Sequence, residues 1–134
     1  MLCIVLASMV MFYKKGYRAE HELIDYFSKK DFCVIRAAGS GINSISPDIL
    51  VFKRGVQMAI EAKAIEKENL NIYREQFENM KRWEEITGIT CYIGWRRNRK
   101  PWILVPLSIF NESEKSFGIN YTRAEMIGKK LEEF

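Results

Sequence analysis

The stretch that decides the fold is DILVFKRGVQMAIEAK, residues 48–63. Two apolar runs flank the basic segment 53–55, a pattern typical of two β-strands joined by a tight hairpin turn. Antiparallel pairing of such strands places the start of the first beside the end of the second. Asp48 is therefore predicted to meet Glu61 and Lys63 at one end of a sheet.

This group of charges predicts chemistry, because each of them interrupts or ends an apolar strand, where burial is costly without a partner. Converging carboxylates bind a hard divalent cation through oxygen, and a magnesium ion would keep several waters and contact phosphate. A lysine beside it can orient or deprotonate an attacking water, or stabilise charge that develops on phosphorus. The alternative is a structural ion pair at a strand end, and the spacing alone also occurs by chance. Glu20 is either a third carboxylate of this site or a surface glutamate near a helix N-terminus.

The patterns on either side predict a mixed α/β chain. Apolar residues at helical spacing, Ala19, Leu23, Tyr26 and Phe27, predict a helix that begins at Tyr17 and ends at Lys29-Lys30. The other expected elements are strands at 32–36, 48–52, 56–63, 90–95 and 102–105, a helix at 72–87 capped by Gly88, a short helix at 122–134, a loop at 37–46, a charged mobile connector at 64–71 and a basic hairpin at 96–101. This order predicts an α/β fold with a mixed central β-sheet flanked by helices.

Composition narrows the class of protein. The chain has 134 residues, of which 48% are hydrophobic, with a net charge of +4, so we expect one compact domain and exclude a disordered, collagen-like or coiled-coil chain. Three cysteines without a CxxC motif argue against a disulfide scaffold and favour a reducing, cytoplasmic location. With a single histidine, a structural zinc site is close to excluded.

The first ten residues, MLCIVLASMV, carry no charge. They are too few to span a bilayer, which takes about 20 residues, and positive charges follow the run instead of preceding it as in a signal peptide. We therefore expect no membrane association. The remaining interpretations are a short extra strand, or a start codon upstream of the natural one at Met9 or Met11, which we favour. The predicted organisation is an apolar extension at 1–10 and a single domain at 11–134.

The densest positive cluster in the sequence lies in the 96–101 hairpin. Basic residues interleaved with aromatic ones suit a phosphate backbone and exposed bases. A solvated turn on an ordinary basic protein explains the cluster equally well. The residues concerned are Trp95, Arg96, Arg97, Arg99, Lys100 and Trp102.

Four blocks, taken in order, resemble the archaeal Holliday junction resolvases. They are KGYRAEHEL at 15–23, FCVIRAAGS at 32–40, Pro47-Asp48 with Glu61-Ala62-Lys63, and YREQ at 73–76. The third block is the signature of the wider PD-(D/E)xK nuclease superfamily, and the whole resemblance covers about residues 13 to 110. It implies a restriction-endonuclease-like nuclease fold.

The resemblance also implies an activity. The expected enzyme is an endodeoxyribonuclease of DNA recombination and repair that resolves four-way junctions by paired, symmetric phosphodiester hydrolysis. Its implied cofactor is Mg²⁺, with Mn²⁺ able to substitute, and its implied partner is branched DNA. A four-way junction has near two-fold symmetry, so paired cuts imply a C2 homodimer.

Residue roles follow from the same resemblance. The implied catalytic residues are Glu20, Ser40, Asp48, Glu61 and Lys63. Glu20, Asp48, Glu61 and the backbone carbonyl of Ala62 would hold the metal, and Lys63 would act on the attacking water. The implied DNA-binding residues are Lys14, Lys15, Arg18, Arg36, Gln76, Arg96, Arg97 and Arg99. For Gln76, a buried polar contact at a helix start explains the residue nearly as well.

Two departures and two alternatives accompany the resemblance. His21 stands where the family usually has arginine, so a phosphate contact is lost there or becomes pH-dependent, and the family does not need the apolar leader. Candidates for a dimer face are Trp83, Tyr92, Trp102 and Leu104, although core packing suits most of them better. The alternatives are a restriction-like or repair nuclease of the same fold and a catalytically silent DNA-binding module. The complete set of catalytic residues argues against the silent module.

Overall fold

The protein is described by a computed structural model that covers the backbone of residues 2–37 and 47–134 and the side chains of residues 16–37 and 47–134. Its elements, in chain order, are α1 Leu2–Lys29, β1 Cys33–Arg36, β2 Ile49–Lys53, β3 Val56–Ala64, β4 Asn69–Tyr73, α2 Arg74–Thr87, β5 Thr90–Arg96, β6 Ile103–Pro106, the 3-10 turn η1 Leu107–Ile109, β7 Asn111–Glu112, β8 Ser116–Asn120, α3 Tyr121–Ile127 and the 3-10 turn η2 Leu131–Glu133. No helix in this part of the chain is long and apolar enough to cross a membrane.

The central sheet has five strands in the order β1-β2-β3-β5-β6. Strands β3 and β5 are parallel, and the other neighbours are antiparallel. Parallel neighbours need a crossover connection, which here contains α2. The sheet is therefore mixed, and the predicted α/β fold class is confirmed.

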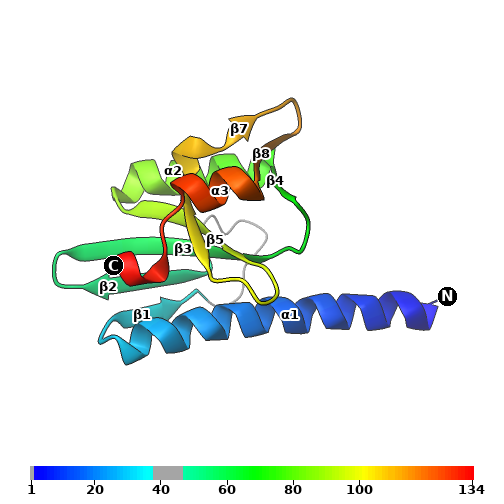
Figure 1. Ribbon diagram of the computed structural model, residues 1–134, viewed down its shortest axis with the longest axis horizontal. Helices are drawn as coiled ribbons and strands as arrows, with labels where there is room; N and C mark the ends of the chain where they lie inside the picture. Colours follow the sequence, from blue (N-terminus) through cyan, green and yellow to red (C-terminus); the bar gives the residue numbers. More distant parts are fainter. Residues whose placement is uncertain (1, 38–46) are drawn as a thin grey trace.

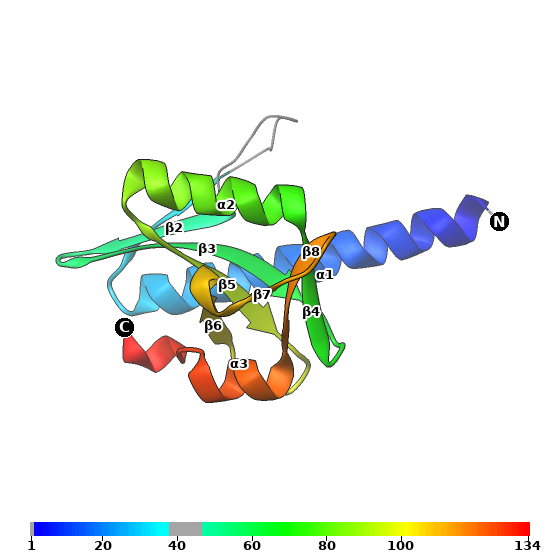
Figure 2. The same ribbon diagram turned by 90° about the horizontal axis from the view of Figure 1, so that it is seen from above.

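Helices cover both faces of this sheet. Figure 1 shows α1 along one face, with its N-terminal end running past the sheet, and α2 and α3 on the other face. Leu23 and Phe27 of α1 are fully buried against β2 and β3. Phe77 and Met80 of α2 lie in the opposite core. Seen from above in Figure 2, a second sheet of three strands, β4-β8-β7, lies between α2 and α3.

Strand parity in β3 separates the two cores. Met58 and Ile60 face the α1 side, whereas Ala59 belongs to the core on the α2 side. Successive side chains of a strand point to opposite faces, so Glu61 and Lys63 follow Ala59 toward α2. The polar end of β3 is thereby directed at the start of that helix.

The N-terminal segment is helical, which corrects two expectations. A short extra strand in residues 1–10 is wrong, because α1 is continuous from Leu2. The predicted start at Tyr17 is also wrong, since Gly16 lies within α1. A side chain added at Gly16 would meet nothing within 4 Å, so this glycine sits in an open part of the helix, where its cost is only about 1 kcal/mol.

The 64–71 segment is not a mobile connector. Strand β3 continues to Ala64, and Asn69–Tyr73 forms β4, so α2 begins at Arg74 instead of residue 72. Leu70 and Ile72 are buried while their neighbours are exposed. This alternation is that of a half-buried strand, and it overrides the helical spacing that Ile72 shares with α2.

The C-terminal part also differs from the single short helix predicted at 122–134. Asn111–Glu112 and Ser116–Asn120 form two strands, the helix α3 ends at Ile127, and a separate 3-10 turn follows. Gly128 ends the helix at a crowded place, because a Cβ there would lie 2.3 Å from Ile103 Cγ2.

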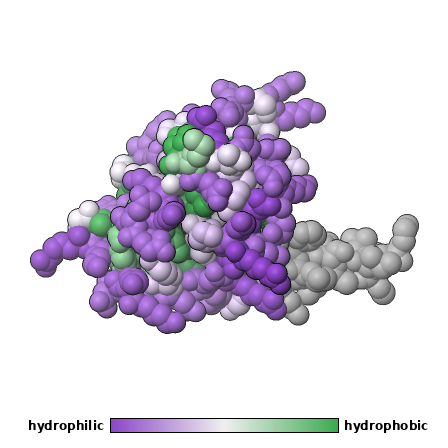
Figure 3. Space-filling model, viewed as in Figure 1, coloured by the Kyte–Doolittle hydropathy of each residue, from purple (hydrophilic) through white to green (hydrophobic). Residues whose placement is uncertain are grey.

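The four residues considered for a dimer face pack within the chain. Tyr92, Trp102 and Leu104 are buried in the core beneath α1. Trp83 is partly buried against the core beneath α2. The dimer-face expectation is therefore wrong for Tyr92, Trp102 and Leu104. The face shown in Figure 3 is mostly hydrophilic, with hydrophobic residues visible in its upper centre and in smaller spots toward the left.

Candidate active site

A carboxylate pair forms where β2 begins and β3 nears its end. A two-residue turn, Arg54-Gly55, joins the strands, and Gly55 has a φ of 79° that suits glycine in such a turn. Ile49 pairs with Ile60, so Asp48 and Glu61 lie side by side at the next position. The backbone N–H of Asp48 donates to Glu61 Oε2 at 3.2 Å, and that of Ala62 donates to Asp48 Oδ2 at 2.8 Å.

Burial makes this pair costly to ionise. It raises the pKa of the Glu61 carboxyl from 4.5 to about 8, and the charge of Asp48 adds to the shift. Burial also raises the pKa of Asp48, and the charge of Glu20 raises it further, against the opposing effects of the Ala62 hydrogen bond and the Lys63 ammonium. Two carboxylates in this state are stabilised by a proton or by a cation between them.

Gln76 connects this pair to Lys63. Its side-chain Nε2 donates to Glu61 Oε1 at 3.1 Å, and its Oε1 accepts from Lys63 Nζ at 3.2 Å. Because Gln76 stands in the first turn of α2, the helix start fixes the ammonium beside the carboxylates. The structure thus places Gln76 in the polar helix-start contact, and its contact with DNA stays a prediction.

Glu20 lies near the pair but is bonded elsewhere. Its Oε2 accepts from Arg36 Nε at 2.9 Å, and Arg36 lies 5.5 Å from the centre of the Tyr17 ring. The ring of His21 is 4.1 Å from that of Tyr17. Among the described side chains, no group of three His, Cys, Asp or Glu residues is close enough to hold one ion. Glu20 is therefore paired with Arg36, and its role as a metal ligand stays a prediction.

The chemistry of the donors fits a divalent cation. Asp48 and Glu61 offer hard oxygen ligands, and their raised pKa values mean that a positive charge between them relieves repulsion. Magnesium keeps several of its waters when bound by one or two carboxylates. The ligand role of the Ala62 carbonyl stays a prediction.

Two arginines of the basic hairpin at 96–101 form ion pairs within the protein, which the sequence did not predict. Arg96 Nε pairs with Glu22 Oε1 at 3.0 Å, and Arg97 Nη2 pairs with Glu68 Oε1 at 3.3 Å. Trp95 and Trp102 are buried, and their indole N–H groups donate to Ile65 O and Glu22 Oε1. Stacking of exposed bases on these two tryptophans is therefore a wrong expectation, whereas Arg99 is exposed.

Three predicted residues fall where the structure says nothing of their side chains. Ser40 lies outside the described residues, and Lys14 and Lys15 are described only as backbone of α1. Arg18 is exposed on α1. It helps line a cavity of about 180 Å³ together with Glu22 and Arg96.

Sequence reasoning missed Glu22, which holds the hairpin against α1 through Arg96 and Trp102. No signal in the sequence pairs Glu22 with Arg96 or Trp102, which lie 74 and 80 positions later in the chain. The bridging role of Gln76 was also missed. The alternation of side chains along β3 hints at this role, because it places Glu61 and Lys63 on the same face of the strand.

A carboxylate pair followed by a lysine at the end of a mixed sheet defines a PD-(D/E)xK nuclease. Comparison with known proteins narrows this class. Residues 11–134 match the family described as "Archaeal holliday junction resolvase (hjc)". The chain belongs to this family, and the predicted resemblance is confirmed.

Similar proteins agree with the family match. The chain is 29% identical over 127 residues to a crossover junction endodeoxyribonuclease Hjc of Archaeoglobus fulgidus, which covers 89% of this chain and 93% of that protein. It is 27% identical over 128 residues to the enzyme of the same name from Methanocaldococcus jannaschii, covering 89% and 92%. The solved structure of A. fulgidus Hjc, a Holliday junction resolvase, superimposes with a TM-score of 0.79 at 26% identity, covering 89% of this chain and 93% of that one.

Proposed function

We propose that this chain is a structure-selective endonuclease that resolves four-way DNA junctions by Mg²⁺-dependent hydrolysis of phosphodiester bonds. The observation that carries the proposal is the connected set of Asp48, Glu61, Gln76 and Lys63 at one end of the sheet. Membership of the resolvase family supports the choice of a branched substrate.

The chain's own groups have separate roles in this reaction. Water attacks phosphorus and the P–O3′ bond breaks, leaving a 5′-phosphate and a 3′-hydroxyl. A bound Mg²⁺ would activate that water and offset negative charge on the phosphate. Lys63, fixed by Gln76, orients the water and stabilises charge on the phosphoryl oxygens. Asp48 and Glu61 would bind the metal, with Glu20 held nearby by Arg36.

DNA contacts would come from the basic residues around this end of the sheet. Arg36 pairs with Glu20, and Arg18 and Arg99 are exposed. Such residues contact phosphates and so carry no base sequence information. This set therefore suits recognition of DNA shape.

Two cuts in one junction require two sites, because one chain supplies one carboxylate pair. We therefore include a C2 homodimer in the proposal. Analytical ultracentrifugation tests it. A dimer at micromolar concentration supports paired cutting, and a monomer that cuts both strands independently contradicts it.

A cleavage assay on a synthetic four-way junction tests the activity, with matched linear duplex as the substrate control. Wild-type protein should cut the junction in Mg²⁺ and not in EDTA, and leave the linear duplex intact. Asp48→Asn should lose cleavage but keep junction binding, because it removes a negative charge. Asp25→Asn, an exposed carboxylate on α1, is the matched control. Normal cleavage by Asp48→Asn would contradict the proposed site.

A further inference from the structure

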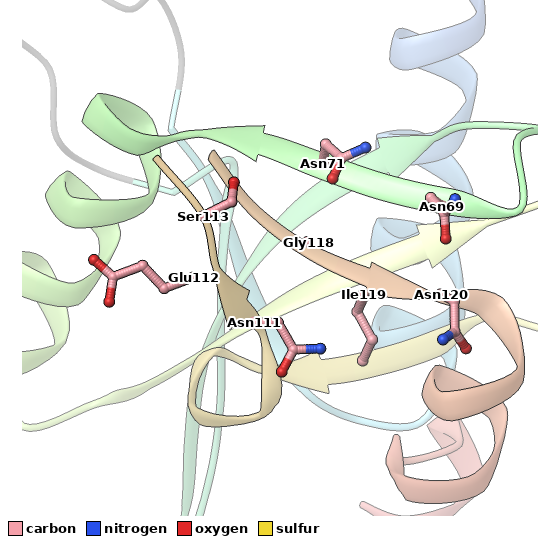
Figure 4. Close-up of a pocket in the computed structure, with 8 residues that line it drawn as sticks. All are labelled: Asn69, Asn71, Asn111, Glu112, Ser113, Gly118, Ile119 and Asn120. Carbon is pink, nitrogen blue, oxygen red and sulfur yellow. The ribbon is translucent and has the colours of Figure 1, made fainter. Parts of the chain in front are cut away.

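The small sheet β4-β8-β7 has one face in the core and one face in solvent. Leu70, Ile72 and Phe117 are buried beneath it. The residues that alternate with them on β4, Asn69, Asn71 and Tyr73, are exposed. Figure 4 shows this small sheet with residues of β4, β7 and β8 that line a pocket, among them Asn69, Asn71 and Asn111.

Asparagine is concentrated on this face. Four of the chain's seven asparagines lie here, namely Asn69, Asn71, Asn111 and Asn120. Asparagine is a poor strand former, so its presence calls for a reason. Asn120 has one, because its Oδ1 accepts from Arg123 N and caps α3. The side-chain amides of the other three make no hydrogen bond within the described part of the chain.

The face is shaped to leave these amides accessible. Asn71 pairs with Gly118, and a Cβ at Gly118 would lie 2.4 Å from Asn71 Oδ1, so glycine gives that amide room to lie across β8. A groove of about 300 Å³ is lined by the four asparagines with Ser113 and Gly118. A second of about 370 Å³ shares Asn71 and adds Tyr73 and Lys115. Because they share Asn71, the two form one continuous surface.

Tyr73 connects this surface to the candidate active site. It is 80% exposed, although a tyrosine ring has much apolar area to bury. It is the last residue of β4, directly before α2, and Gln76 is the third residue of that helix. The groove therefore ends beside the helix start that bonds Glu61 and Lys63.

We propose that this outer face binds unpaired nucleotides next to the branch point of the DNA cut at the Asp48–Glu61 site, an inference that rests on the proposed function. An exposed tyrosine ring stacks on any base. An asparagine amide carries both donors and acceptors for a base edge. Lys115 lies at the same end of the groove for a phosphate. Glu112 does not repel the strand, because Arg74 Nη1 pairs with it at 2.7 Å.

Fluorescence anisotropy of a labelled oligothymidine tests this in EDTA, where no cleavage occurs. Wild-type protein should bind the oligonucleotide, and Tyr73→Ala should bind it about tenfold more weakly, as expected for one stacked base. Tyr73→Phe, which keeps the ring, should restore binding. Asn71→Ala should also weaken binding. Because Asn71 lies within β4, this variant tests the outer face without changing the residue next to α2. Met126→Ala is the control, since Met126 is also 80% exposed but lies on α3.

Several outcomes would overturn the inference. They are no oligonucleotide binding by wild-type protein, equal binding by Tyr73→Ala and wild type, or a loss in Tyr73→Phe as large as in Tyr73→Ala. Junction cleavage by wild-type protein in Mg²⁺ is measured separately. Its absence would contradict the proposed function, while oligonucleotide binding would still decide whether this face takes unpaired bases.

Discussion

Gln76 lies in the first turn of α2, and its side-chain Nε2 donates a hydrogen bond to Glu61 Oε1 at 3.1 Å. The same amide accepts from Lys63 at 3.2 Å, so one neutral group holds the Glu61 carboxyl and the Lys63 ammonium in a fixed relation. Each half of the amide matches its partner, because nitrogen donates to the carboxylate and oxygen accepts from the ammonium.

Gln76→Ala should lower Mg²⁺-dependent junction cleavage about 10- to 100-fold, the usual cost of removing a group that orients a metal ligand. Single-turnover rates measured over a range of Mg²⁺ concentrations would show both a lower maximum and a higher metal requirement. Glu75→Ala, an exposed neighbour on α2, is the control. If Gln76→Ala cuts like wild type, Lys63 does not depend on the bridge.

The stability of the metal-free protein should fall as pH rises from about 4.5 to about 8. The pKa of Glu61 is raised from 4.5 to about 8 in the folded chain, so over this interval the unfolded chain loses a proton that the folded chain keeps. Glu61→Gln removes this ionisation and should flatten the dependence. Thermal unfolding in EDTA at several pH values measures it.

Adding Mg²⁺ provides the second half of that experiment. The cation should raise the melting temperature of wild type more at pH 8 than at pH 6, because protons compete with it for the carboxylates. Glu61→Gln should lose most of this effect, and Glu75→Gln should keep it. An equal response in both variants would place the metal elsewhere.

Arg36→Ala should weaken junction binding more than it lowers the stability of the fold. The Arg36–Glu20 pair is partly exposed, with side-chain exposures of 41% and 20%, and such pairs contribute about 1 kcal/mol or less. We therefore expect urea unfolding close to wild type, but weaker junction binding and slower cleavage. A large loss of stability would show that the pair is structural instead.

Arg97 and Arg99 should behave differently although they are two residues apart. Arg97→Ala removes the bond to Glu68 and a contact with the Tyr121 ring 4.4 Å away, so it should destabilise the hairpin. Arg99→Ala should leave stability unchanged and lower the salt dependence of junction binding by about one phosphate contact. Binding isotherms at several salt concentrations separate the two. Identical salt slopes for Arg99→Ala and wild type would place Arg99 outside the interface.

The parts that sequence predicted well are local. Asp48, Glu61 and Lys63 lie on two strands joined by a two-residue turn, so hairpin geometry alone brings them together. The strand predicted at 32–36 also rests on a local pattern, and it is observed as β1. Contacts across long separations, such as Glu22 with Trp102, depend on how α1 crosses the sheet, and no pattern within either segment contains that information.

The missed strand β4 has a different cause. Asn69 and Asn71 oppose strand formation by propensity, while Leu70 and Ile72 favour it only once β8 is there to pair with them. The partner strand lies more than forty residues later, so tertiary pairing decided the outcome. The helix was predicted to begin at residue 72, but α2 begins at Arg74. Tyr73 is therefore the last residue of β4 and not part of the helix.

The two-residue turn at Arg54-Gly55 has a consequence for how the chain can vary. Because side chains alternate along β3, one residue inserted in that turn and carried through the pairing would exchange the two faces of the strand. Glu61 and Lys63 would then point into the apolar layer under α1, and Met58 and Ile60 toward α2. The length of this short turn thus decides which face of β3 carries the charged groups, and Gly55, with its positive φ, is the position in the turn where a substitution would strain the backbone.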